Sequence, residues 1–305
     1  MGTQVMTVLG VAALATVGAA GCADDDGPEV PGLAPLGCTL GGRDAYAVTA
    51  ADSARDWESL EALALDLDGP PETVGHNALG LQAVALHDGY PETWDPDGVA
   101  AARLTGGATR WVIEIERCSD ADTVRVTSGR AVDADGDGLW TVVDHGVPSV
   151  GTVRGRAIAT GRGIGAVPIG TLAAGSPTAA TDDWQVGLAL TTALVVGANR
   201  LDGVVGIALD PTAAALRTPV CRFMDERLAG GASTYAAHQD LDHDGVLEPS
   251  ECDYWLDGEL GADLDLGACD DVACYRPDHP DGVLDHASLG VGIHAEAIEL
   301  ELSGR

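Results

Sequence analysis

Apolar side chains hold every odd position of Trp111-Val112-Ile113-Glu114-Ile115-Glu116, and glutamate holds the last two even positions. A period of two assigns alternate side chains to opposite faces of a β-strand. Thr123–Thr127 continues the pattern. Trp184–Val196 and Leu201–Leu209 form a long apolar pair interrupted by the turn residues 197–200, which is typical of a hairpin. These segments predict a mainly β protein.

Shorter segments on either side extend the β prediction. Tyr46–Val48 begins the domain, and the glycine-rich stretch Val150–Leu172 suggests two strands. The final stretch, Leu289–Leu302, alternates with one slip of phase, which we interpret as a strand with a bulge. Short strands separated by turns favour a sandwich or a barrel. We expect a β-sandwich-like body.

Helical signals are few and cluster before the last strand. Val99–Leu104 precedes the stop signal Gly106-Gly107. Val220–Leu228 follows Thr218 as N-cap and Pro219 as first helical residue, with Phe223 and Leu228 expected inside. Pro249 and Glu251 open a further helix. Residues 218–288 are therefore predicted to form a small helical insertion before the last strand.

The most specific motif lies within this insertion, at Asp240-Leu-Asp-His-Asp-Gly-Val-Leu-Glu-Pro-Ser-Glu251. Carboxylates at loop positions 1, 3, 5, 9 and 12, with glycine at position 6, resemble an EF-hand calcium loop. The alternative is an acidic surface loop. The resemblance implies one Ca2+ ion bound by the carbonyl oxygen of Val246 and by the carboxylates of Asp240, Asp242, Asp244, Glu248 and Glu251.

Three other loops carry parts of the same pattern. The second candidate metal loop offers Asp133, Asp135, Asp137, the carbonyl of Leu139, and Asp144. An Asp-Gly hairpin turn explains it equally well. Residues 66–77 look like a solvated turn. Residues 277–288 repeat Asp-Gly-Val-Leu with most ligands lost, so we expect a pseudo-site whose Leu284 backbone pairs with Leu247, with His279 and His286 in solvent.

The charge of the chain excludes several functions. The chain has 48 acidic residues and 16 basic ones, all of them arginine, which gives a net charge of −32. Without lysine there is no Walker-type phosphate lysine and no Schiff base. The acidic surface repels phosphates, so we expect no nucleic-acid partner. Divalent cations are the natural counter-ions.

The N-terminal region predicts export and lipidation. An apolar run from Val5 to Ala20 ends in Ala19-Ala20-Gly21-Cys22, which resembles the lipobox of bacterial lipoproteins, although residues 1–4 lack Arg and Lys. Residues 1–21 are then a signal peptide, and Cys22 carries the lipid that anchors the chain to a membrane. Residues 22–37, acidic and proline-containing, are expected to be a disordered tether. The folded domain spans residues 38–305.

An exported chain places its remaining cysteines in an oxidising compartment. The disulfide candidates are Cys38, Cys118, Cys221, Cys252, Cys269 and Cys274. We favour Cys38 with Cys118 and pairings among the last four, which would staple the helical insertion. Zinc held by Cys269, Cys274 and His279 is the competing interpretation.

Lipobox, acidic tether, Asp-Gly-rich loops and β body together resemble the uncharacterised EF-hand-containing lipoproteins of myxobacteria and their relatives. The resemblance implies a cell-envelope location. Ala23, after the lipidated cysteine, favours the outer membrane by likeness to sorting rules in other bacteria. It implies no activity and identifies no protein or glycan partner.

Enzymatic motifs are absent from the sequence. It contains no G-x-S-x-G, H-E-x-x-H or P-loop, and Gly161–Ala166 lacks the following helix that a dinucleotide site needs. We expect a non-enzymatic calcium-binding envelope lipoprotein with a structural or interaction role. The alternatives are a calcium-dependent carbohydrate-binding or adhesive module and a carboxylate-based hydrolase.

Overall fold

The computed structural model describes residues 40–65, 67, 77–119, 122–161, 163–231, 234–260, 262–264, 284 and 286–301. Within these residues the strands are β1 (Leu40–Asp52), β2 (Thr109–Cys118), β3 (Thr123–Val132), β4 (Thr141–His145), β5 (Ser149–Arg154), β6 (Ala157–Thr160), β7 (Gly163–Val167), β8 (Gln185–Val196), β9 (Arg200–Leu209) and β10 (Ala287–Ala297). The helices are α1 (Trp57–Leu63), α2 (Ala78–Gly89), α3 (Pro96–Gly106), α4 (Ile169–Leu172), α5 (Ala214–Ala229), α6 (Thr234–Gln239) and α7 (Pro249–Glu259).

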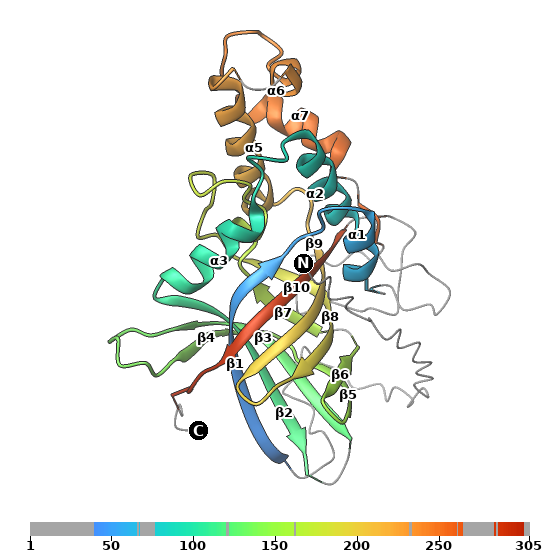
Figure 1. Ribbon diagram of the computed structural model, residues 1–305, viewed down its shortest axis with the longest axis vertical. Coiled ribbons are helices and arrows are strands. Elements are labelled where there is room, and N and C mark those ends of the chain that lie inside the picture. The colour runs from blue at the N-terminus through green and yellow to red at the C-terminus, as the bar shows by residue number, and fades with distance from the viewer. Residues whose placement is uncertain are drawn as a thin grey trace, which may run out of the picture.

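The strands form one antiparallel sheet that closes into a barrel (Figure 1). Their order is β2-β1-β10-β9-β8-β6-β5-β3-β4, and a further pairing of β2 with β3 closes the ring. The prediction of a mainly β protein is confirmed, but the expected sandwich is wrong. Closure gives the outer edge of β2 a partner, which removes the unpaired backbone groups that this edge of an open sheet would expose, while β4 pairs with β3 outside the ring.

β8 is long enough to pair with two different strands along one edge, which lets the sheet curl. β8 pairs with β7 through Gln185–Leu190 and with β6 through Ala193–Val195, while its other edge pairs with β9. Gly203 of β9 adopts φ +153°, and a Cβ atom there would lie 2.2 Å from the carbonyl oxygen of Ala193. Such a close approach of two paired strands requires glycine.

The alternation in β2 sorts its side chains as expected. Trp111, Ile113 and Ile115 are fully buried. On the intervening positions Glu114 pairs with Arg43 of β1. Glu116 lies 2.6 Å from Arg125 at the paired position of β3. Trp111, Ile113 and Ile115 therefore belong to the core, and the opposite face of β2 carries the buried Val112 beside two cross-strand ion pairs.

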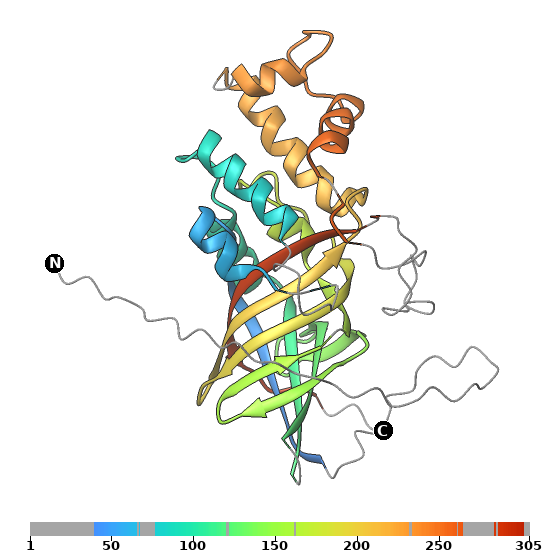
Figure 2. The ribbon, with the colours of Figure 1, turned by 90° about the vertical axis from the view of Figure 1, so that its right-hand side faces the viewer.

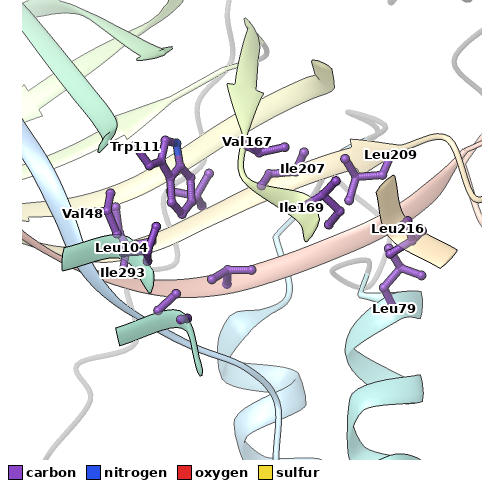
Figure 3. Close-up of a cluster of buried hydrophobic side chains, with 14 of the residues drawn as sticks. Val48, Leu79, Leu104, Trp111, Val167, Ile169, Ile207, Leu209, Leu216 and Ile293 are labelled. Atoms are coloured by element: carbon purple, nitrogen blue, oxygen red, sulfur yellow. The ribbon is translucent and has the colours of Figure 1, made fainter. Parts of the chain in front are cut away.

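The helices gather at one end of the barrel, and their apolar side chains continue its core (Figure 2). Leu79 of α2, Leu104 of α3 and Leu216 of α5 belong to the same buried cluster as Trp111 and Ile293 (Figure 3). β9 and β10 pair along ten residues, although α5, α6 and α7 separate them in sequence. The helical segment is thus inserted between neighbouring strands.

Several element boundaries differ from the predictions. Residues 150–172 form three strands and α4 instead of two strands. α5 starts at Ala214, so Pro219 lies inside the helix rather than at its first position. β10 stops at Ala297, and Leu300 makes an isolated bridge with Trp140, so the predicted bulge is wrong. The bulge lies instead in β1, between Val48 and Ala50.

The predicted helix before Gly106-Gly107 and the hairpin of β8 and β9 are present. Asp95 accepts a hydrogen bond from the Gly98 N–H and caps α3. In α5, Phe223 is fully buried and Leu228 packs at the edge of the same cluster. Within the described residues, no helix is both long and apolar enough to span a membrane.

One disulfide is defined in full, and it joins two of the four cysteines that we expected to pair among themselves. Cys221 of α5 is bonded to Cys252 of α7, with a Cα–Cα separation of 5.8 Å. Cys118 is also disulfide-bonded. Its expected partner Cys38 lies outside the described residues, as do Cys22, the zinc candidates Cys269, Cys274 and His279, and the N-terminal segments 1–21 and 22–37.

Candidate metal centre

The acidic loop Asp240–Glu251 runs from α6 into the first turn of α7. α6 makes the loop the connection between two helices. Ala236 of α6 is fully buried, so the short helix is held by its apolar side. The local arrangement is therefore helix, loop and helix, as in the motif it resembles.

Two contacts fix this loop to α5. The N–H of Leu247 donates to Asp225 Oδ1 at 3.0 Å, and the Leu247 side chain is buried in the main core. The disulfide between Cys221 and Cys252 joins α5 to α7 directly after Glu251. The loop thus has its middle and its end attached to the same helix. The sequence alone did not identify Asp225, because this residue lies 22 positions before Leu247.

The predicted acidic ligands converge in two overlapping groups. Carboxylate oxygens of Asp240, Asp242 and Glu251 lie within 4.8 Å of one another, and so do those of Asp242, Asp244 and Glu248. Oxygen atoms that bind one Ca2+ ion at about 2.3–2.6 Å lie at most about 5.2 Å apart. Each group is therefore compact enough for one cation, and Asp242 belongs to both.

Backbone N–H groups orient the two buried members of the set. Asp240 Oδ2 accepts from the Gly245 N–H at 2.9 Å, where φ of +90° at Gly245 makes the turn. Glu251 Oε1 accepts from the Leu241 N–H at 2.6 Å. Asp240 and Glu251 are 4% and 8% exposed, so these carboxylates are held in place before any ion binds. Asp242 and Asp244 are exposed.

Negative charge accumulates around this loop. The chain has no arginine or lysine between Arg227 and Arg276. The hydrogen bond with Glu251 raises the pKa of Glu248, which reflects how closely the two carboxyl groups approach. Crowded carboxylates repel one another, and a divalent cation relieves that repulsion.

The second candidate loop, between β3 and β4, assembles only in part. Oxygens of Asp133, Asp135 and Asp137 come within 4.8 Å of one another. Asp144 does not belong to this group. It lies on β4, where it pairs with Arg130 of β3 at 2.8 Å. Leu139 is exposed, and its N–H donates to Asp137. The pairing of β4 with β3 therefore keeps Asp144, the expected last ligand, outside this group.

The remaining loops give no ligand set among the described residues. Asn77 caps α2 and also accepts from the Gly290 N–H. Leu247 donates to Asp225 rather than to Leu284, which is exposed. His286 is buried and its backbone pairs with Leu264, so the expectation of a solvated histidine is wrong. Most of residues 66–77 and 277–288 lies outside the described part.

A different titratable cluster lies on the outer face of the barrel, and sequence reasoning missed it. His294 Nδ1 lies 2.9 Å from Asp202, and its Nε2 lies 2.9 Å from Asp52. The three residues come from β10, β9 and β1, so only strand pairing brings them together. The Asp202 hydrogen bond, followed by that to Asp52, outweighs burial and raises the pKa of His294.

This cluster predicts a pH-dependent contribution to stability. Because the folded state raises the pKa of His294 above its ordinary value of 6.5, the contribution is complete below pH 6.5 and is lost as pH rises through the folded pKa. We expect His294→Gln to lower the free energy of unfolding by about 0.5–1 kcal/mol at pH 5.5 and by less at pH 8.5. Urea unfolding at both pH values measures this. An equal loss at both would contradict the prediction. The Asp52→Asn/Asp202→Asn variant should show the same flattened pH dependence.

Comparison with known proteins adds no assignment: no family model, curated protein or solved structure matches this chain.

Proposed function

We propose that this protein is a calcium-binding lipoprotein of the cell envelope, in which Ca2+ holds the helical segment α5–α7 in its folded arrangement. The observation that carries the proposal is the convergence of Asp240, Asp242, Asp244, Glu248 and Glu251 in two overlapping oxygen groups. Six to eight oxygen ligands at flexible positions are what Ca2+ accepts, with carboxylates, a carbonyl such as that of Val246, and water.

The proposed role of the ion is structural. It would bind oxygens from both ends of the loop, and the loop is already tied to α5 through Asp225 and the disulfide. A ligand that binds only the folded state raises the free energy of unfolding. The increase grows with the logarithm of the ratio of free ligand concentration to dissociation constant. Extracellular calcium sites have dissociation constants of about 0.1–1 mM, so we propose constant occupancy rather than signalling.

Calcium removal should lower the melting temperature. At 10 mM Ca2+ these dissociation constants correspond to about 1.4–2.7 kcal/mol, or an increase of about 3–10 °C over protein in EGTA. Differential scanning calorimetry of the exported, folded domain measures the shift. Asp240→Asn combined with Glu251→Gln should abolish most of it.

A matched control uses the other acidic loop. Asp133→Asn combined with Asp135→Asn removes the same number of charges from the loop between β3 and β4, and it should leave most of the calcium shift in place. A melting temperature indifferent to both calcium and EGTA would refute the proposed role. If only the control pair abolished the shift, the calcium site would lie in the loop between β3 and β4 instead.

The envelope location is proposed from Cys22 and the residues around it. Lipid attachment at this cysteine would anchor the domain through residues 22–37, with the outer membrane as the favoured site. Metabolic labelling with palmitate tests the anchor. Wild-type protein should be labelled and Cys22→Ala should not, and equal labelling of the two would end this part of the proposal.

A further inference from the structure

We infer that Asp225 of α5 is a positioning residue of the calcium loop, and that it sets the direction of the Val246 carbonyl, the backbone ligand of the proposed site. The inference rests on the proposed function. Asp225 Oδ1 accepts a hydrogen bond from the Leu247 N–H at 3.0 Å. α5 lies beside α6 and α7, the two helices that flank the loop (Figure 2). The carboxylate therefore reaches the loop from a separate helix.

The bonded N–H and the proposed ligand belong to one peptide unit. The carbonyl of Val246 and the N–H of Leu247 lie on either side of the same planar bond, and in a trans peptide they point in opposite directions. Because the N–H is directed at Asp225 on α5, the carbonyl is directed away from α5. One hydrogen bond thus fixes the direction of this oxygen.

Val246 lies beside the carboxylates of the proposed site. Its own N–H donates to Asp244 Oδ1 at 2.8 Å, and Asp244 belongs to the oxygen group with Asp242 and Glu248. Asp225 belongs to neither oxygen group among the described residues. Its role is therefore to hold the loop, while the loop residues bind the ion.

The other backbone donors in this part of the loop have partners within the loop. The N–H groups of Gly245, Val246 and Glu248 donate to loop carboxylates, whereas that of Leu247 donates to Asp225. Gly245 adopts φ +90°, and glycine restricts the backbone least. A contact from outside the loop therefore has the most to fix at the peptide unit that follows Val246.

Both partners of this hydrogen bond are held by the core. Asp225 follows Phe223 and Met224 on α5, and both of these side chains are fully buried. The Leu247 side chain is 6% exposed and packs in the same cluster. The expected partner of the Leu247 backbone was Leu284 in the second Asp-Gly-Val-Leu segment. Asp225 takes that place.

Selective isotope labelling isolates this peptide unit. The sequence contains three Val-Leu pairs, at residues 8–9, 246–247 and 283–284, and the exported chain that begins at Cys22 keeps the last two. In protein with 13C-carbonyl valine and 15N-leucine, an HNCO spectrum shows only such pairs. The Val246 signal is identified by its loss in Val246→Ala, and the other signal is the internal reference. In the wild type, the Val246 carbonyl signal should shift in a saturable way as calcium is added.

Three substitutions on α5 test the role of Asp225. Asp225→Ala removes the acceptor, so the calcium affinity followed by the Val246 signal should fall about 10- to 100-fold. Asp225→Asn keeps an acceptor oxygen and should stay within about fivefold of the wild type. Glu226→Ala is the matched control, because Glu226 accepts from Ser176 and Thr178 instead of the loop, and it should leave calcium affinity unchanged.

The outcomes distinguish this inference from the calcium site itself. If the wild type binds no calcium in equilibrium dialysis, the proposed site and the inference both fall. If it binds calcium without a shift of the Val246 signal, only the inference falls. Wild-type affinity in Asp225→Ala, or an equal loss in Asp225→Asn or Glu226→Ala, would also overturn the inference and leave the calcium site in place.

Discussion

Replacing Trp111 with alanine should lower the free energy of unfolding by about 3–5 kcal/mol. Trp111 is fully buried inside the barrel, and its indole N–H donates to Ser128 Oγ at 2.8 Å. Ser128 in turn donates to the carbonyl of Ala166 at 2.9 Å, so the indole supports a chain of contacts from β2 through β3 to β7. The substitution leaves a cavity and removes one donor from a buried hydroxyl.

Guanidinium unfolding followed by far-ultraviolet circular dichroism measures this loss. Trp57→Ala is the matched control, because Trp57 is 65% exposed on α1 and the same truncation there should change stability by less than about 0.5 kcal/mol. Similar losses in the two variants would mean that Trp111 does not fill the barrel as described.

Removing the disulfide between α5 and α7 should have the second-largest effect. Cys221 and Cys252 are 31 residues apart, and a closed loop of that length stabilises the folded state by about 3–4 kcal/mol through the reduced entropy of the unfolded chain. We expect Cys221→Ala/Cys252→Ala to lose about that amount. The double variant is more informative than a reductant, because Cys118 is also disulfide-bonded.

The calcium response should persist when this disulfide is removed, because the disulfide and the proposed ion constrain the same segment. Without the disulfide, the melting temperature should respond to calcium at least as strongly as in the wild type. Calorimetry with and without EGTA checks both effects. A loss below about 1 kcal/mol, or a double variant that no longer responds to calcium, would contradict the proposed arrangement.

Local periodicity predicted the strands but left the closure of the sheet undetermined. The alternation of Trp111, Ile113 and Ile115 correctly separates core from outer face. Closure depends on the pairing of β2 with β3 and of β1 with β10, and the second of these joins residues at least 240 positions apart. A sandwich and a barrel require the same alternation along each strand, so this pattern could not decide between them.

The candidate metal loop was predictable because its ligands lie within 12 consecutive residues, Asp240 to Glu251. Features that depend on contacts across the fold were not. Asp144 matched a loop position, but its partner is Arg130 on the neighbouring strand. The hydrogen bond between Asp225 and Leu247 joins α5 to the loop, and the His294 cluster combines three strands. No short stretch of sequence contains either pattern.

Equilibrium dialysis against 45Ca2+ at millimolar concentration measures whether the loop Asp240–Glu251 binds calcium. We expect saturable binding of calcium with a dissociation constant of about 0.1–1 mM, with one ion per chain lost in the Asp240→Asn/Glu251→Gln variant. No bound calcium in the wild type, or the same number of ions in that variant, would refute the proposed calcium site.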